Sequence, residues 1–593
     1  MTERAGRRWV EAGGGGAGRG PGAAAGPAAQ AEIEALAAAL GLHPLAARVL
    51  HARGHADPAE ARDYLQAPLS GLPDPFLMKG MEAAVARLAR AVEAGEKIAA
   101  YGDYDVDGVT STVLFTGLLR AAGADVVTYT PHRLTEGYGL NGAAVEKLAA
   151  QGVTVLVTLD CGITSVEEVR AAAARGMDTV VVDHHTVPVE LPAAAAILNP
   201  HQPGCGYPSK DLAAVGVTFA LCMALRRRLR EAGRFGPQRP EPNLKDALDL
   251  VALGTVADVV PLTGANRILV RWGLPQIARA HRPGLRALKR VAGLAEGAPV
   301  TAGQVGFRLA PRINAAGRLD DAGRGVRLLL TTDEAEARAL ATELDQENQA
   351  RQELERAMLD QAMADAEAAV ARGARGLVLA RDGWHPGVVG IVAARVAERF
   401  HRPSVLIALG AGTDGQAGKG SGRSIEGFHL YDALAACREH LAAFGGHRHA
   451  AGVTVSPASL VPFRLAFEAH ALAALTEEQL VPRQRIDGWV EAGELTARAA
   501  EDLEKLGPYG AGHPEPIFAL RAAAEKVRTV GAGQQHLKLT VGKGLDAIGF
   551  GLGALAPACR GPVELAFSLG FDDWDGMKRL QLRLRDLRAA ARD

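Results

Sequence analysis

The stretch KIAAYGDYDVDGVTS (Lys97–Ser111) joins a short apolar run to three aspartates and a glycine. KIAAY has the character of a buried strand, and Asp103, Asp105 and Asp107 alternate directly after it. Side chains two residues apart share one side of an extended backbone, so these carboxylates can converge. Carboxylates that converge raise one another's pKa unless cations neutralise them. The stretch therefore predicts a strand that ends in a cation site, with a solvated acidic turn as the alternative.

A calcium-binding EF-hand loop is excluded for this stretch. Such a loop requires a glutamate at its twelfth position and a helix before its first. Counted from Asp103, the twelfth residue is Leu114, and the residues before the loop are strand-like.

The next strand-like runs end in the same chemistry. VTVLVTLD ends at Asp160, TVVVDHH ends at Asp183, His184 and His185, and the apolar segment VALGTVADVVPL carries Asp258. Open α/β sheets bind ligands at the carboxyl ends of their strands, so we expect these groups to meet there. A helix cap or a turn residue is the alternative for each aspartate taken alone.

The predicted ligands are carboxylate oxygens and imidazole nitrogens. That combination suits Mn²⁺, or Mg²⁺, better than a metal that prefers thiolates. The number of acids predicts two ions, which together promote displacement at phosphorus. Because adjacent residues of a strand face opposite sides, we expect one of His184 and His185 on metal and the other facing substrate.

The bulk composition limits the class of protein. A chain of 593 residues predicts several domains, and a net charge of −1 gives no preference for a polyanionic partner. The five cysteines form no C-x-x-C pair, which excludes the usual zinc ribbons and fingers. No apolar stretch reaches the roughly 20 residues of a membrane span, and residues 1–16 do not form a secretory signal. We expect a cytoplasmic protein.

Changes in sequence pattern divide the chain into successive regions. The predicted fold class is α/β, with a mostly parallel sheet, a long connector helix without Gly or Pro, a second α/β domain and a small C-terminal barrel. The regions are a low-complexity tail (1–30), a helical region (31–93), the first α/β domain (94–331), the connector helix (332–372), the second α/β domain (373–475) and the β-rich region (482–593).

These motifs resemble a known family. DYDVDG, TLDCG, VVDHH and GTVADVVPL resemble, in this order, the four acidic motifs of the DHH phosphoesterase superfamily. YTPHRLTEGYGL, PRINAAGRLDDA, GWHPGVVGIVAAR, GKGSGRSI and FGGHRHAAGVTV are similar to segments of the RecJ family of 5′→3′ single-stranded-DNA exonucleases. The resemblance covers nearly the whole chain apart from the low-complexity tract. It implies a DHH domain, a DHHA1 domain and an OB-fold.

The resemblance also implies roles for the acidic groups. It makes Asp105, Asp107, Asp160, His184 and Asp258 the metal ligands, with Asp160 bridging two ions. The remaining site residues are catalytic: Asp103, which binds metal, orients a water molecule or supports the ligands; His185, which faces the scissile phosphate; and Asp183, which orients a histidine.

The implied activity is metal-assisted hydrolysis of single-stranded DNA to 5′-mononucleotides in recombination and repair, without a covalent enzyme intermediate. Substrate phosphates need cationic or amide donors beside the anionic ligands. The candidates are Arg312, Asn314 and Arg318 near the metals, and Gly420, Ser421, Gly422, Arg423, Gly445, Gly446 and His447 in the second domain. A tight turn with a solvent-facing arginine is the alternative for each segment.

Two further regions could contact DNA. The basic run from Arg226 to Arg239 would track the DNA backbone or form a solvated helix end. The β-rich region would bind single strands by charge and stacking, although its aromatics are scarce. Those aromatics are Trp489, Phe518, Phe550 and Phe567.

The resemblance further implies that the protein works beside single-strand-binding protein and a RecQ-type helicase, and we expect a monomer. Two alternatives stay open. One is a superfamily hydrolase of oligoribonucleotides, cyclic dinucleotides or pyrophosphate, and the other is a non-catalytic relative that binds single-stranded DNA.

Overall fold

The structure, a computed structural model, describes most of the chain in two units. The described residues are 7–11, 26–132, 136–137, 139–319, 323–411, 417–542, 544–572 and 577–590, without the side chains of residues 27, 318 and 319. The parallel-sheet unit comprises Gln66–Arg351 and Pro508–Pro514. The barrel unit comprises Met1–Leu65, Gln352–Gly507 and Glu515–Asp593.

The parallel-sheet unit is built on a sheet with the strand order β3-β2-β4-β5-β6, all pairs parallel. Its strands are largely apolar over their whole length because both faces of the sheet are covered. In β2, Ile98 and Ala100 pack into one core, and Ala99 and Tyr101 pack into the other. The strands are β2 (Lys97–Gly102), β3 (Asp125–Tyr129), β4 (Val153–Leu159), β5 (Asp178–Val182) and β6 (Ala196–Leu198).

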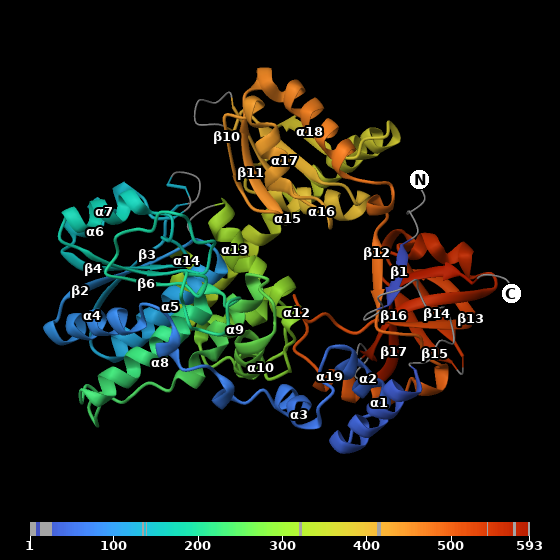
Figure 1. Cartoon of the computed structure of the whole chain (residues 1–593), viewed down its shortest axis with the longest axis horizontal. Coiled ribbons are helices and arrows are strands. Elements are labelled where there is room, and N and C mark those ends of the chain that lie inside the picture. The colour runs from blue at the N-terminus through green and yellow to red at the C-terminus, as the bar shows by residue number, and fades with distance from the viewer. Residues whose placement is uncertain are drawn as a thin grey trace. The chain divides into compact units, whose positions relative to one another are not determined.

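Helices cover both faces of this sheet (Figure 1). α6 and α7 pack on one face, and α4, α5 and α8 pack on the other. The helices from α9 to α14 extend the core that contains Ile98 and Ala100 beyond the sheet. Their bounds are α4 (Met81–Ala94), α5 (Val106–Ala121), α6 (Gly142–Ala150), α7 (Val166–Ala174), α8 (Ala214–Glu231), α9 (Leu248–Ala257), α10 (Gly264–Arg279), α11 (Pro283–Val291), α12 (Ala302–Gln304), α13 (Ala310–Leu319) and α14 (Gly323–Leu330).

The predicted connector helix is confirmed as α15 (Glu334–Ala371). Asp333 caps its start, since the carboxylate accepts hydrogen bonds from the N–H groups of Ala335 and Glu336, both at 2.7 Å. Gly373, at a φ of 91°, follows its end. The run of helix-forming residues between these two signals contains no glycine or proline to interrupt it.

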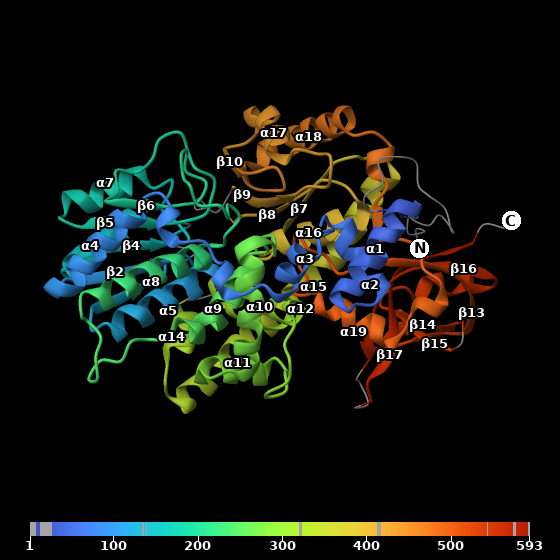
Figure 2. The same cartoon turned by 60° about the horizontal axis from the view of Figure 1, so that its bottom comes forward.

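The barrel unit contains a second α/β sheet with the order β10-β11-β9-β8-β7. β7 and β8 are parallel and the other pairs are antiparallel. α17 and α18 lie on one side, and α16 lies on the other (Figure 2). The elements are β7 (Leu377–Asp382), α16 (Val389–Phe400), β8 (Ser404–Leu409), β9 (Gly418–Arg423), α17 (Leu430–Ala436), β10 (Ala443–Gly446), β11 (Ala450–Val455) and α18 (Leu460–Ala474).

The predicted C-terminal barrel is confirmed as a closed sheet of order β13-β14-β15-β17-β16. Phe518 and Phe567 lie fully buried in its core, whereas Phe550 is 67% exposed, so only the last of these three rings is available for stacking. The elements are β12 (Arg483–Ile486), α19 (Ala497–Lys505), β13 (Phe518–Val530), β14 (His536–Val541), β15 (Leu545–Gly549), β16 (Pro562–Asp572) and β17 (Arg579–Ala589).

The N-terminal part differs from the sequence-based expectation in two ways. Within the expected low-complexity tail, β1 (Arg8–Glu11) pairs with β12 in parallel, because RWVE supplies strand-forming side chains. The expected helical region 31–93 is divided between the two units at Gln66. The helices before that residue are α1 (Pro27–Leu40), α2 (Pro44–Ala52) and α3 (Pro58–Gln66).

Among the described helices, no single one has both the length and the apolarity to cross a membrane. Ala28–Leu40 and Pro44–Ala52, bent by 115°, reach that length and composition only as a pair.

Candidate metal centre

Three aspartates stand at the carboxyl edge of the parallel sheet, each directly beyond a strand. A chain of backbone hydrogen bonds fixes them there, because each aspartate N–H donates to the last carbonyl of the neighbouring strand. The sheet thereby sets the spacing of these residues before any side-chain contact forms. The bonds join Asp103 to Leu159 (3.1 Å), Asp160 to Val182 (2.9 Å) and Asp183 to Leu198 (2.9 Å).

The loop that follows β2 is held by its own carboxylate. Asp105 caps α5, and its Oδ1 accepts hydrogen bonds from the N–H groups of Asp107 (2.9 Å) and Gly108 (3.1 Å). Gly108 has no room for a side chain, because an added Cβ would collide with the backbone of Asp103. The loop therefore folds back tightly and brings its three aspartates to one place.

Asp107 is buried against the N-terminus of α8. Its Oδ2 accepts from the N–H of Ala214 (2.7 Å), and its Oδ1 accepts from the N–H of Val215 (2.8 Å). Burial, together with the charge of Asp105, nevertheless raises the pKa of Asp107 to about 7. The helix terminus partly compensates the negative charge. Gly254 of α9 lies beside this contact, where an added Cβ would come within 3.1 Å of Asp107 Oδ1 and 2.9 Å of Val215 Cγ1.

Asp160 occupies the centre of the acidic groups. It is 2% exposed, and its backbone has a φ of 66°, a conformation that costs energy in a residue with a side chain. Burial, and next the charges of Asp105 and Asp107, raise its pKa well above the usual value. Such strain and charge accumulation in one residue are typical of a functional site.

The two histidines have different surroundings. Although burial opposes a charged ring, the hydrogen bond from His185 Nδ1 to Asp183 Oδ1 (2.7 Å) raises the pKa of His185 to about 9. Burial lowers the pKa of His184 to about 4, so that ring is neutral near pH 7. A neutral imidazole is the form that binds a metal. His184 Nε2 lies 3.3 Å from Asp160 Oδ1, 3.5 Å from Asp258 Oδ2 and 3.9 Å from Asp107 Oδ2.

The Asp183 carboxylate is hydrogen-bonded to the ring of His185, whereas its contact with His184 is to the backbone N–H. Besides the His185 ring, its carboxylate accepts hydrogen bonds from the backbone N–H groups of His184 (2.8 Å), His185 (3.1 Å) and Ile163 (3.0 Å). Burial opposes its charge, but these donors, the His185 ring first among them, hold the pKa of Asp183 below its usual value.

The donor atoms fall into groups that suit cations. Asp103, Asp105 and Asp160 offer ligand atoms within 4.8 Å of one another, and so do Asp107, His184 and Asp258. A third set, Asp160, His184 and His185, meets the same limit and shares a member with each of the first two. Within the described residues, buried atoms on Asp160, Asp258 and His184 have no hydrogen-bond partner. Buried polar atoms are nearly always paired, so their isolation indicates that a cation binds here. The atoms are Asp160 Oδ1, Asp258 Oδ2 and His184 Nε2.

Asp258, which shares a group of ligand atoms with Asp107 and His184, comes from a different element of the fold. It caps the C-terminus of α9, where burial and the charges of Asp107 and Asp105 raise its pKa to about 9. Carboxylates with pKa values at or above neutrality favour their charged forms only when a positive charge is present. The donor set of oxygens and one imidazole fits Mn²⁺ or Mg²⁺.

The PRINAAGR segment lies in α13 and supports the acidic loop. Asn314 Oδ1 accepts from the N–H of Val106 at 3.1 Å. A Cβ on Gly317 would lie 2.6 Å from the Tyr104 carbonyl, so the helix and loop are in close contact. The Arg312 guanidinium instead donates to Asp345 (2.8 Å) and to backbone carbonyls of Arg308 and Val291. The side chain of Arg318 lies outside the described residues.

The backbone N–H groups within GSGRS, expected to bind a phosphate, lie in a strand between two other strands. Gly420, Ser421, Gly422 and Arg423 belong to β9, which is paired with β8 on one side and with β11 on the other. The sheet uses the backbone N–H groups that would have held a phosphate, so only side chains are left for that purpose. Arg423 donates to Ser421 Oγ at 2.9 Å.

The GGH segment lies at the edge of the same sheet. Gly445 and Gly446 end β10, opposite Gly452 and Ala451 of β11. His447 donates its backbone N–H to the Ala450 carbonyl at 2.8 Å, which closes the hairpin.

The basic run is largely occupied by contacts within its own unit. Arg226 and Arg230 pair with Glu241, Arg227 pairs with Glu231, and Arg228 pairs with Glu82. Arg234 donates to the Ala122 carbonyl at 2.8 Å. These contacts favour a structural role over DNA binding for the run.

Sequence reasoning missed one residue of this edge. Asn199, fully buried beyond β6, donates from Nδ2 to the His185 carbonyl (2.9 Å) and accepts from the N–H of His201 (2.8 Å). The strand AAAILNP was visible in the sequence, and a polar residue at its end was the available signal.

Three family profiles match the chain. A profile described as "DHH family, N-terminal domain" matches residues 97–255, a "DHHA1 domain" matches residues 373–470, and a "RecJ OB domain" matches residues 486–586.

Curated relatives and solved structures agree with these profiles. The chain is 43% identical to the single-stranded-DNA-specific exonuclease RecJ of Dickeya dadantii, over 88% of this chain and 93% of the relative. It is 38% identical to RecJ of Bacillus subtilis, over 93% and 69%. The structure of RecJ from Thermus thermophilus in complex with Mn²⁺ superposes with a TM-score of 0.82 at 34% identity, covering 100% of this chain and 81% of that one. The corresponding Mg²⁺ complex gives 0.75 at 32% identity, covering 100% and 80%.

Proposed function

Because the chain belongs to the RecJ family of single-stranded-DNA-specific exonucleases, we propose that it hydrolyses single-stranded DNA to 5′-mononucleotides in the 5′→3′ direction. The reaction depends on divalent ions, Mn²⁺ or Mg²⁺. The observation that carries the proposal is the convergence of two acidic groups, drawn from separate strands and helices, at one edge of the sheet.

The two groups would each hold one ion. Asp103, Asp105 and Asp160 form the first group. Asp107, His184 and Asp258 form the second. Asp160 Oδ1, from the first group, lies 3.3 Å from His184 Nε2, from the second. This short distance supports the proposal that Asp160 would bind both ions. When bound, divalent ions would neutralise the charge of these carboxylates, make water a better nucleophile near neutral pH and stabilise charge on the phosphate.

The surroundings of His185 support a role toward substrate. Its side chain is 44% exposed, and its raised pKa keeps the ring charged near neutrality. A charged imidazole can donate a hydrogen bond from Nε2 to a phosphate oxygen while Nδ1 remains bound to Asp183. Asp183 thus acts as a positioning residue, and Asn314 positions the acidic loop through Val106.

Other parts of the proposal rest on the family resemblance. Arg312, Arg318, Ser421, Arg423 and His447 remain candidates for contacts with the DNA backbone, together with Gly420, Gly422, Gly445 and Gly446 around them. The barrel is proposed to bind single strands, and Phe550 is its exposed ring. We further propose a cytoplasmic monomer that acts in recombination and repair with single-strand-binding protein and a RecQ-type helicase.

End-labelled oligonucleotides test the activity and its direction. The chain should release labelled mononucleotide at once from 5′-labelled single-stranded DNA with Mn²⁺, and late from 3′-labelled DNA. An oligoribonucleotide and a cyclic dinucleotide of equal concentration serve as comparison substrates. Faster hydrolysis of either, or early release from the 3′ end, would contradict the proposal.

A further inference from the structure

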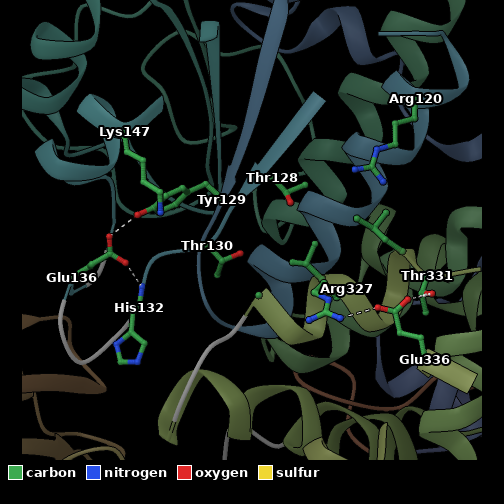
Figure 3. Close-up of a pocket in the computed structure, with 13 residues that line it drawn as sticks. Arg120, Thr128, Tyr129, Thr130, His132, Glu136, Lys147, Arg327, Thr331 and Glu336 are labelled. Carbon is green, nitrogen blue, oxygen red and sulfur yellow. Dashed lines mark hydrogen bonds and ion pairs between the residues drawn. The ribbon is translucent and has the colours of Figure 1, made fainter. Parts of the chain in front are cut away.

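A pocket of about 560 Å³ lies beside β3 in the parallel-sheet unit. None of the residues that line it belongs to the acidic groups of the metal centre. It is lined by residues from the end of α5, from β3 and the segment after it, and from α6. Residues of α14, together with Thr331 and with Glu336 in the first turn of α15, complete the lining. Figure 3 shows these side chains around the open space.

β3 is the edge strand of its sheet, with β2 as its neighbour on one side. An edge strand leaves part of its backbone N–H and C=O groups unpaired. Thr128 and Thr130 point to one side of this edge, and Tyr129 points to the other, as strand geometry requires (Figure 3). In the described part of the chain, neither threonine hydroxyl has a hydrogen-bond partner, so both can bind a ligand.

The pocket is rich in cationic groups. Arg120, exposed in the last turn of α5, has no ion pair or hydrogen bond from its guanidinium to any described residue. Arg327 of α14 shares the same side of the strand and pairs with Glu336 at 2.8 Å (Figure 3). On the opposite side, Lys147 lies 5.0 Å from the centre of the Tyr129 ring. Guanidinium groups and hydroxyls together are typical of phosphate recognition.

The acidic residues of the pocket are already satisfied. Glu136 accepts hydrogen bonds from the Tyr129 hydroxyl and the His132 N–H, both at 2.7 Å. Glu336 accepts from Arg327 and from Thr331. The cationic side chains of Arg120, Lys147 and Arg327 outnumber these two carboxylates, so the net charge of the lining is positive, which favours an anionic ligand.

One end of the pocket, at Tyr129 and Thr130, lies at the carboxyl edge of the sheet, where the metal centre also lies. Tyr129 is the register partner of Tyr101, two residues before Asp103, and the two rings stack with centroids 5.3 Å apart. Thr130 thus lies one strand away from the acidic loop. A group bound in the pocket would leave the candidate metal ligands unoccupied, because the two sets share no residue.

We propose that this pocket binds a nucleotide phosphate, held by Arg120 and Arg327 together with the hydroxyls of Thr128 and Thr130. The choice of a nucleotide rests on the proposed function, which produces mononucleotides from a polynucleotide. The phosphate belongs either to a released 5′-mononucleotide or to the backbone of a bound strand. The volume accommodates one nucleotide.

Hydrogen exchange on the full chain without divalent ions tests the pocket. The probes are 5′-thymidine monophosphate, inorganic phosphate, a twelve-residue oligothymidylate, and thymidine as the control that lacks phosphate. A phosphate-bearing probe should slow exchange in Asp125–Tyr129 and Gly323–Leu330, and thymidine should not. Arg120→Gln should weaken this protection about tenfold. Arg90→Gln, which neutralises an exposed arginine of α4 outside the pocket, should leave it unchanged.

The probes distinguish the two sources of phosphate. Protection by the monophosphate and by inorganic phosphate supports a free nucleotide, and protection by the oligothymidylate alone supports the strand backbone. Protection by no phosphate-bearing probe, or protection that is equal in Arg120→Gln and wild type, overturns the proposal. Thr130→Val is a second variant that decides the question if Arg120→Gln fails to fold, because it should also weaken protection.

Hydrolysis of DNA with Mn²⁺ is measured separately on the wild-type chain. Hydrolysis without binding in the pocket contradicts this inference alone. Binding in the pocket without hydrolysis contradicts the proposed function and leaves the phosphate site in place.

Discussion

Nδ1 of His185 lies 2.7 Å from Oδ1 of Asp183, and this contact separates the roles of the two neighbouring histidines. Although burial acts in the opposite direction, this contact raises the pKa of His185 to about 9, whereas burial lowers the pKa of His184 to about 4. One histidine thus offers a positive charge and the other a free nitrogen lone pair, at adjacent positions of the chain.

Replacement of Asp183 should therefore change the pH profile of the reaction. In Asp183→Asn one amide oxygen can still accept from the N–H groups of His184 and His185, but Ile163 loses its acceptor. The charge that raises the pKa of His185 is also lost. The alkaline limb of kcat/KM should move to lower pH by roughly two units. The profile is measured from pH 6 to 10, with Asp125→Asn, an exposed aspartate of β3, as the control. An alkaline limb that stays in place would show that His185 is not the titrating group.

Replacement of Asp160 should remove hydrolysis and spare binding. Asp160→Asn keeps the shape of the side chain but loses the charge shared by the two groups of donors. We expect kcat to fall by about 10³-fold or more, with the affinity for oligothymidylate within about threefold of wild type. Full activity in a purified preparation of this variant would refute the assigned bridging role.

The metal-free chain should become less stable as the pH rises from 6.5 to 9. The folded-state pKa values of Asp107 (about 7) and Asp258 (about 9) exceed the value of 3.8 for an unfolded aspartate, so the folded state holds more protons in this window. The raised pKa of His185 acts in the same direction, since its stabilisation is complete below 6.5 and lost as the pH passes 9. Stability falls with pH wherever the folded state binds more protons.

Thermal unfolding measures this dependence. The midpoint for the parallel-sheet unit should fall across the window without divalent ions, and saturating Mn²⁺ should flatten the slope because the ion replaces the protons. A midpoint of the metal-free chain that rises with pH would contradict the assignment.

A methyl group added at Gly254, which is not a proposed metal ligand but packs beside one, should disturb the metal centre. In Gly254→Ala the new Cβ would collide with Thr110 Oγ1 and would lie 2.9 Å from Val215 Cγ1 and 3.1 Å from Asp107 Oδ1. Overpacking of this kind costs about 1–3 kcal/mol and should also weaken Mn²⁺ binding, which titration calorimetry measures. Gly117→Ala is the matched control, since that exposed helical glycine has no atom within 4 Å of its added Cβ. The control should be neutral or stabilising.

The acidic edge of the sheet was predictable because its signals are local. Asp103, Asp160 and Asp183 each follow an apolar run, and parallel strands bring such positions to one edge. The long helix was equally visible, because no residue between its caps interrupts it.

The contacts that remained hidden are those between distant segments. Asp107 binds the N-terminus of α8, and no sequence signal names that partner. β9 lies between two other strands, which a glycine-rich segment does not reveal, so the N–H groups expected to bind a phosphate are used for sheet pairing. β1 likewise pairs with β12, a strand from the far end of the sequence.

The central claim is that the two groups of donors bind a pair of divalent ions, and anomalous scattering from a crystal soaked in Mn²⁺ tests it most directly. We predict two manganese peaks roughly 3.5–4 Å apart. One should lie among Asp103, Asp105 and Asp160, and the other among Asp107, His184 and Asp258. Manganese bound elsewhere, with these side chains left without an ion, would contradict the account.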